Sequence, residues 1–218
     1  MSIFQQLVQH SQPHWTQYIQ HDFVQGIATG TLPKAAFQHY LKQDYRYLFQ
    51  YSRALSLGIF KADNFAQMAQ ANEAISILLK EINVHLQFCQ QWGIAESEVF
   101  ATEESFACIA YTRYVLDCGI NGGLAELYAA LLPCAAGYAE IGRWIKNSGI
   151  SAENNPYQAW IDAYAADDFQ AGVQKMIYLF ESVCCQLNEK QLQNLQTIFT
   201  TATKMEIAFW QMGLDLTL

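Results

Sequence analysis

The segment that decides the fold is Pro33–Lys61, PKAAFQHYLKQDYRYLFQYSRALSLGIFK, which follows a break at Gly30. Its apolar residues recur at intervals of three and four, the spacing that places them on one face of an α-helix. Proline is favoured at the start of a helix, and glycine just past the end of the one before it. The segment therefore predicts a long amphipathic helix that begins near Pro33 and ends near Lys61.

Helical periodicity extends from this segment through nearly all of the 218 residues, and no convincing alternation of apolar and polar residues predicts a strand. Four prolines leave little sequence for linkers, and a chain that is 52% hydrophobic can build one substantial core. We therefore expect an all-α helical bundle with short connections, forming a single domain over residues 1–218. The predicted helix starts and breaks lie at Ser11 with Pro13, Gly30 with Pro33, Asp63, Gly93, Asn121 to Gly123, Asn147 to Pro156, Asp167, and Asn188 with Gln191.

The charge balance argues against a nucleic-acid partner. The formal net charge is −8 and no run of basic residues occurs, whereas phosphate binding needs clustered Lys and Arg.

The N-terminal sequence MSIFQQL lacks the charged start and apolar stretch of a signal peptide. The six cysteines show neither CxxC nor zinc-finger spacing, so we expect reduced thiols in a cytoplasmic protein.

The most apolar stretch, Gly122–Gly142, is expected to be a buried helix rather than a membrane span. It contains Glu126 and Glu140, and two carboxylates near the middle of a bilayer would be costly. We therefore expect no membrane partner.

One face of the helix predicted from Pro33 carries a carboxylate among phenols. A carboxylate that faces inward must be hydrogen-bonded, and phenol hydroxyls are suitable partners. The arrangement fits a core Asp satisfied by tyrosines, and it also fits a polar pocket wall that recognises a flat, nitrogen-rich ligand. The residues, at i, i+4, i+7 and i+11, are Tyr40, Asp44, Tyr47 and Tyr51.

Cys134 is the one cysteine whose surroundings suggest a site. Pro133 removes a backbone donor and presses on the carbonyl of Ala129, which can open space beside Cys134, and Tyr138 follows one turn later. Nothing nearby in the sequence supplies a cation that would lower the pKa of the thiol. A free cysteine is also commonly a small core residue, which is the interpretation we give to Cys89, Cys108, Cys118, Cys184 and Cys185.

Glu206, followed by Phe209 and Trp210 on the last predicted helix, has two interpretations. It can face solvent beside an aromatic anchor, or it can be buried with a raised pKa and exchange protons near neutrality. Sequence alone leaves both open.

Metal and haem sites have weaker support. Glu81 and His85, at i and i+4, could bind a metal, but such pairs are common on solvated helix faces. A di-iron bundle needs carboxylate and His ligands from several helices, and no ExxH motif accompanies the other histidines. Gly119, Gly122 and Gly123 could border a haem, although a turn explains them more simply. We therefore expect neither a metal site nor a haem site.

Four separated segments together resemble the thiaminase II (TenA) family. The resemblance runs across nearly the whole chain in the right order and spacing, and the LPC-x3-Y-x-E-I-G segment combined with QDYxYL is its most specific part. The segments are Gln43–Leu48, Ala110–Thr112, Leu132–Cys134 with Tyr138–Gly142, and Glu206 with Phe209 and Trp210.

This resemblance implies a heme-oxygenase-like helical fold that binds no haem, needs no cofactor and is usually a homotetramer. It implies hydrolysis of 4-amino-5-aminomethyl-2-methylpyrimidine to the hydroxymethylpyrimidine and ammonia, and in related enzymes cleavage of thiamin. By matching position, Cys134 would be the nucleophile and Glu206 the proton-transfer group. Asp44 would hold the amino and ring nitrogens of the pyrimidine, helped by Tyr47, Tyr111, Tyr138 and, from a less distinctive match, Tyr164.

Ala135 and Ala136 depart from many relatives, which have bulky aromatic residues directly after the cysteine. The departure affects the expected pocket size and substrate preference more than the nucleophile. Two other functions stay open: a non-catalytic pyrimidine-binding or regulatory protein on the same fold, and a haem or iron oxygenase.

Overall fold

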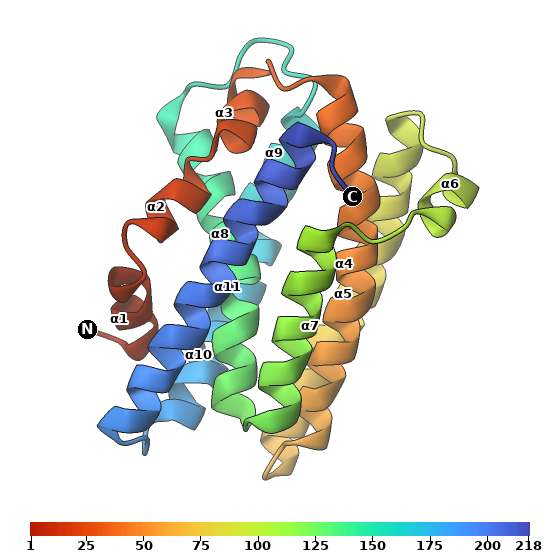
Figure 1. Ribbon diagram of the computed structural model, residues 1–218. Helices are drawn as coiled ribbons and strands as arrows, with labels where there is room; N and C mark the ends of the chain where they lie inside the picture. The colour runs from red at the N-terminus through yellow and green to blue at the C-terminus, as the bar shows by residue number, and fades with distance from the viewer.

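The computed structural model describes all residues, Met1–Leu218, and confirms the expected all-α class. It contains eleven α-helices and no strand (Figure 1). The helices are α1 (Ile3–His10), α2 (His14–Ile19), α3 (Asp22–Thr29), α4 (Lys34–Phe60), α5 (Phe65–Gln91), α6 (Glu96–Ala101), α7 (Phe106–Asn121), α8 (Leu124–Ser148), α9 (Gln158–Ala165), α10 (Asp167–Cys184) and α11 (Glu189–Asp215).

The long helix predicted from Pro33 is confirmed as α4. Gly30 ends α3 in the left-handed conformation, with φ 73°, which glycine adopts without a steric penalty. Pro33 then precedes the first residue of α4. The capping box predicted at Asn188 and Gln191 before α11 is also confirmed, as are the breaks near Pro13, Gly93 and Asn121–Gly123.

Two predicted caps were wrong by one residue. Asn64, and not Asp63, caps α5, because its side-chain oxygen accepts a hydrogen bond from the backbone N–H of Gln67 at 3.0 Å. Asp167 does not cap α10 but is its first residue, since Ala166 holds the extended conformation before it. A carboxylate in the first turn still favours the helix through its dipole.

The long helices run roughly along one axis, with α1 to α3 climbing one side and α6 projecting at the other (Figure 1). Helix α8 lies at the centre and packs against α7, α9, α10 and α11, while α4 packs against α5, α7, α8 and α11. The 52 buried hydrophobic residues form one connected cluster. No helix is both long and apolar enough to cross a membrane.

Helix α8 is the most deeply buried element, and two glycines let neighbours approach it closely. A Cβ at Gly137 would lie 2.1 Å from the ring of Tyr18, so α2 can pack here only against glycine. A Cβ at Gly142 would lie 2.6 Å from the backbone of Tyr164, so α9 needs glycine too. The helix continues to Ser148, which shortens the loop predicted from Asn147. These contacts place Tyr18 and Tyr164 beside the turns that follow Cys134.

Candidate active site

Helices α4, α7, α8 and α11 bring Asp44, Tyr111, Cys134 and Glu206 into one buried region. Tyr111 donates a hydrogen bond of 2.7 Å to Oε1 of Glu206. The charges of Glu206 and Asp44 both act on the thiol of Cys134. The resemblance placed these side chains in a single site, and the structure brings them together.

Glu206 is buried, with 2% of its surface exposed, which excludes the solvent-facing interpretation. Burial raises the pKa of Glu206 to about 8, and the hydrogen bond from Tyr111 opposes part of that rise. At neutral pH its carboxyl group therefore holds a proton. It is suited to donate that proton and take up another.

Asp44 is also buried, and burial raises its pKa to about 7. Of the three phenols predicted on its helix face, only Tyr40 reaches it, with a hydroxyl 3.5 Å from Oδ2. Tyr51 instead donates to the carbonyl of Leu131 at 3.4 Å, so a single phenol of this face contacts Asp44.

Cys134 is half-buried as a residue, and the pKa of its thiol is raised well above its ordinary value. Burial is the main cause, and the charges of Glu206 and Asp44 add to it, while the nearby Tyr47 hydroxyl opposes it. Since no cation acts on the thiol, its proton must leave during any nucleophilic attack rather than beforehand.

The remaining cysteines fit the core interpretation with one exception. Cys89, Cys108, Cys118 and Cys184 are buried, but Cys185 is exposed, so its assignment to the core was wrong. It is the residue after the end of α10, where the chain turns outward.

Three buried polar groups at this site have no hydrogen-bond partner within the protein. They are the hydroxyls of Tyr18 and Tyr47 and the indole N–H of Trp210. The Tyr47 hydroxyl lies near Cys134 and the Tyr18 hydroxyl near Glu206, as their effects on these pKa values indicate. Buried polar groups are rarely left unpaired in native proteins, so these donors are positioned for a polar ligand.

Aromatic rings enclose the region on its other sides. Tyr138 on α8 packs edge-on against Tyr164, with 4.8 Å between ring centroids, and lies tilted against Trp210 at 5.3 Å. Tyr47 and Tyr111 lie 5.0 Å apart. These four tyrosines and the tryptophan therefore offer flat surfaces on which a heteroaromatic ring can stack.

Two surface clefts reach this region from the side of α5. One, of about 260 Å³, is lined by His85, Trp160 and Tyr164. The other, of about 360 Å³, is lined by Tyr51 and Ala135. Ala135 therefore faces space that a bulky aromatic residue would fill, whereas Ala136 is buried in the core.

Sequence reasoning considered His85 only as a metal ligand beside Glu81 and missed its contact with Asp44. Glu81 is exposed, as expected for a solvated face, but His85 is buried and its Nδ1 lies 3.4 Å from Oδ2 of Asp44. The interpretation of His85 as solvated was wrong, because α5 packs this turn against α4. Tyr18, from the short helix α2, was missed as well, and only Gly137 in the sequence hints at its close approach.

No three His, Cys, Asp or Glu side chains gather closely enough to hold a metal ion. The glycines considered for a haem contact serve the turn between α7 and α8. A Cβ at Gly122 would lie 2.5 Å from the Glu126 side chain, and one at Gly119 would lie 2.8 Å from that of Leu127.

The sequence was compared with protein families and with known proteins. Residues 8–216 match the model of the TENA/THI-4/PQQC family. An uncharacterized protein of Haemophilus influenzae is 59% identical, over 98% of this chain and 100% of its own. Two relatives named aminopyrimidine aminohydrolase are similar over 98% of this chain: that of Halalkalibacterium halodurans is 35% identical over 96% of its length, and that of Helicobacter pylori 33% over 99%.

Solved structures agree with these relatives. A TenA family transcription regulator from Silicibacter is 37% identical with a TM-score of 0.92, covering 97% of this chain and 96% of its own. A TenA homologue from P. horikoshii is 27% identical with a TM-score of 0.90, covering 99% of both chains.

Proposed function

The chain belongs to the TENA/THI-4/PQQC family, and from that premise we propose that it is an aminopyrimidine aminohydrolase of the thiaminase II type. It has the helical, heme-oxygenase-like fold of its TenA neighbours. Its substrate is 4-amino-5-aminomethyl-2-methylpyrimidine, which it hydrolyses to the hydroxymethylpyrimidine and ammonia. The relatives that carry the enzyme's name match the chain over nearly their whole length, which supports the assignment.

One observation carries the chemical part of the proposal. A neutral thiol, Cys134, and a neutral carboxyl group, Glu206, share an enclosed region with unpaired hydrogen-bond donors. A purely structural core has no need of two titratable groups whose pKa values burial has raised. The combination suits covalent catalysis with proton transfer.

The first step is addition of the Cys134 sulfur to a ring carbon of the pyrimidine. The C–S bond forms as the S–H bond breaks, and a ring nitrogen gains a proton. Glu206 can donate its own proton to that nitrogen and receive the thiol's proton in return, so its carboxyl group stays neutral throughout. Such a positioned acid and base contributes about 10²–10⁴-fold to the rate.

The second step is departure of the leaving group. Addition has broken the aromaticity of the ring, so ring electrons can expel the amine from the exocyclic carbon, and it leaves as ammonia with the proton of the ring nitrogen. The hydroxyl of water then adds to that carbon and its proton returns to the ring nitrogen. The C–S bond breaks, the ring nitrogen gives up this proton, and Cys134 regains its thiol. In these two steps the nucleophiles are the thiol and water, the carboxyl groups transfer protons or bind the ring, and no cofactor takes part.

Asp44 holds the amino and ring nitrogens of the pyrimidine in this proposal. Tyr47 and Tyr111 form one wall of the site, and Tyr138 and Tyr164 form another. The unpaired Tyr47 hydroxyl supports this arrangement, because a bound heterocycle would give it a partner. The cleft beside Ala135 extends the site toward solvent, which supports acceptance of thiamin, a larger substrate that carries a thiazole ring.

We further propose that residues 1–218 form a single domain that assembles as a homotetramer in the cytoplasm. The single connected core supports one domain. All six cysteines are free, which is typical of a reducing compartment. An interface that involves α5 is supported by the exposed apolar residues of this helix, namely Phe65, Ile77, Leu79 and Val84.

Ammonia release from the aminomethylpyrimidine tests the function. We expect turnover by the wild-type protein, and loss of it in Cys134→Ser, because a hydroxyl is a far weaker nucleophile than sulfur. Cys185→Ser, the same change at the exposed cysteine, should keep full activity. Activity that survives Cys134→Ser undiminished would refute the role of the thiol.

A pyrimidine-binding regulatory protein is the alternative, and one structural neighbour bears the name of a transcription regulator. That function predicts tight binding of the hydroxymethylpyrimidine with no ammonia release by the wild-type protein. Turnover at ordinary enzyme rates would exclude it as the main function, and a coloured or iron-containing preparation would instead indicate an oxygenase.

A further inference from the structure

His85 on α5 is held by one ring nitrogen and faces Asp44 with the other. Its Nε2 lies 2.8 Å from the carbonyl oxygen of Leu41, and its Nδ1 lies 3.4 Å from Oδ2 of Asp44. Both side chains are buried, with 8% and 4% of their surfaces exposed. The ring therefore bridges the backbone of α4 and the carboxyl group that the proposed function assigns to substrate binding.

The two contacts fix the number of protons that the pair holds. A carbonyl oxygen only accepts hydrogen bonds, so Nε2 must carry a hydrogen. If His85 is neutral, its Nδ1 is then a bare acceptor, and it faces a carboxyl oxygen. A second proton must lie between Nδ1 and Oδ2, on one atom or the other, because two buried lone pairs would repel.

Either position of that proton leaves the pair with no net charge. Protonated Asp44 beside neutral His85 is uncharged, and the ion pair of carboxylate and imidazolium sums to zero. Burial favours the uncharged forms of both groups, raising the pKa of Asp44 to about 7 and lowering that of His85 to about 4. The pair therefore enters the reaction as a neutral unit with a resident proton.

Tyr40 adds a second constraint on the same oxygen. The indole Nε1–H of Trp160 lies 3.3 Å from the Tyr40 hydroxyl, and an indole can only donate. The Tyr40 hydroxyl thus accepts from Trp160 and directs its own hydrogen to Oδ2 of Asp44. Oδ2 is engaged by two protein groups, while Oδ1 forms no hydrogen bond within the protein.

We propose that His85 is a positioning residue, which holds a shared proton against Oδ2 of Asp44 and so keeps Oδ1 turned to the substrate's exocyclic amino group. This inference rests on the proposed function for the identity of the substrate, but the proton-sharing pair stands without it. A carboxyl group fixed in this way accepts a hydrogen bond from the amino group without adding a negative charge beside the thiol. A mobile, ionised Asp44 would instead oppose thiol ionisation, since its charge already raises the pKa of Cys134.

No cation other than a protonated His85 is available to hold Asp44 ionised. The titratable groups that the charge of Asp44 affects carry either no charge or a negative one. They are Tyr40 on α4, Cys89 on α5, Cys108 on α7, Cys134 and Tyr138 on α8, Tyr164 on α9 and Glu206 on α11.

Nitrogen NMR of ¹⁵N-histidine-labelled protein tests the pair without any substrate. The His85 resonances, identified from their loss in His85→Gln, should show a protonated Nε2 across about pH 6 to 8, where an ordinary histidine titrates. Asp44→Ala should move the Nδ1 resonance toward that of a bare lone pair. A bare Nε2, or an Nδ1 resonance indifferent to Asp44→Ala, would overturn the shared proton.

Calorimetric binding of the hydroxymethylpyrimidine tests the positioning role. His85→Phe should weaken binding by roughly tenfold to a hundredfold, as small displacements of an aligned group do. His85→Gln should recover part of the loss, because an amide can donate to Leu41 and accept from Asp44. Unchanged affinity in a folded His85→Phe protein would overturn the inference and leave the proposed function intact.

His39 supplies the matched control. Its Nε2 also contacts a backbone carbonyl, that of Thr217 at 2.9 Å, but no carboxyl group lies against its ring. His39→Phe should therefore bind the hydroxymethylpyrimidine as the wild type does. Failure of the wild-type protein itself to bind would refute the proposed function and the substrate role of the pair, while the NMR result would still decide the shared proton.

Discussion

At the scale of single residues, the site depends on keeping acids uncharged. Glu206 and Asp44 lie among aromatic rings, and burial raises the pKa of Glu206 to about 8 and that of Asp44 to about 7. The same surroundings keep Cys134 a thiol. Catalysis then requires protons to move in exchange, which is possible because donors and acceptors already lie together.

Burial of Glu206 should make the stability of the fold depend on pH. Its pKa rises from 4.5 to about 8, so between these values the unfolded chain releases a proton that the folded chain keeps. The free energy of unfolding should therefore fall as pH rises, by up to about 1.4 kcal/mol per pH unit for this group. Urea unfolding of Glu206→Gln should show a flatter pH dependence than the wild type over this range. Parallel curves would contradict the buried, protonated carboxyl group, and Glu153→Gln at an exposed site is the control.

Ala135 should set how large a leaving group the site accepts. Ala135→Phe would place a ring in the cleft of about 360 Å³ beside Tyr51. We expect kcat/KM for thiamin to fall by roughly tenfold or more relative to the aminomethylpyrimidine, because only the larger substrate extends into this space. Competition between the two substrates measures this ratio directly, and a ratio that does not change would place the thiazole elsewhere.

At the scale of helices, α8 determines how the site is packed, because its glycines leave room for α2 and α9 to bring Tyr18 and Tyr164 close to Cys134. Gly137→Ala should destabilise the protein by about 3 kcal/mol, since its methyl group would overlap the Tyr18 ring. Gly172→Ala on α10 is the matched control, because nothing lies within 4 Å of its Cβ. That change should stabilise by about 0.5–1 kcal/mol. Equal unfolding midpoints for the two variants would contradict the packing of α2 on α8.

Helix boundaries could be predicted wherever the signal is local. Gly30 and Pro33 determine the backbone angles at the break they mark, and Asn188 satisfies backbone donors within its own turn. Asp63 and Asn64 are adjacent residues that can both act as caps. The choice between them depends on where the chain enters the helix, which composition does not reveal.

Site residues could be predicted only where motifs carry them. Asp44, Cys134 and Glu206 belong to recognisable segments, but the partner of Asp44 does not. His85 meets Asp44 because two 27-residue helices pack in one particular register. Tyr18 likewise reaches the site through a contact with Gly137 that lies far away in the sequence. Such contacts depend on tertiary packing, which helical periodicity alone does not specify.

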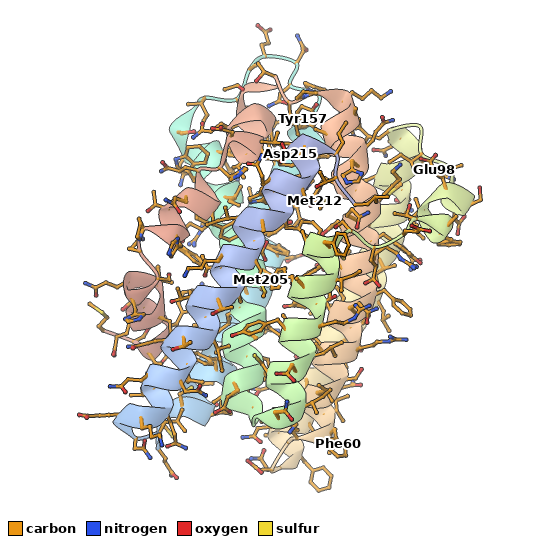
Figure 2. The ribbon with its side chains drawn as sticks, viewed as in Figure 1. Phe60, Glu98, Tyr157, Met205, Met212 and Asp215 are labelled. Atoms are coloured by element: carbon orange, nitrogen blue, oxygen red, sulfur yellow. The ribbon has the colours of Figure 1, made fainter.

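At the scale of the whole molecule, the apolar residues that remain exposed support the proposed assembly. Leu79 is 53% exposed on α5, and Phe60 is 82% exposed where it projects from the end of α4 (Figure 2). Light scattering during gel filtration should give four times the 24.7 kDa of one chain. Leu79→Glu should reduce that mass, because a carboxylate in an apolar interface loses its hydration. A monomeric wild type at micromolar concentration would refute the homotetramer.

The claim on which the account depends is that the Cys134 sulfur and the carboxyl groups of Glu206 and Asp44 surround one heterocycle. A crystal structure with the hydroxymethylpyrimidine bound tests it most directly. We predict the ring among the site tyrosines, with its amino group at Asp44, a ring nitrogen at Glu206, and a ring carbon roughly 3–3.5 Å from the Cys134 sulfur. A ring bound only in the outer clefts, with the sulfur screened from it by protein side chains, would contradict the account.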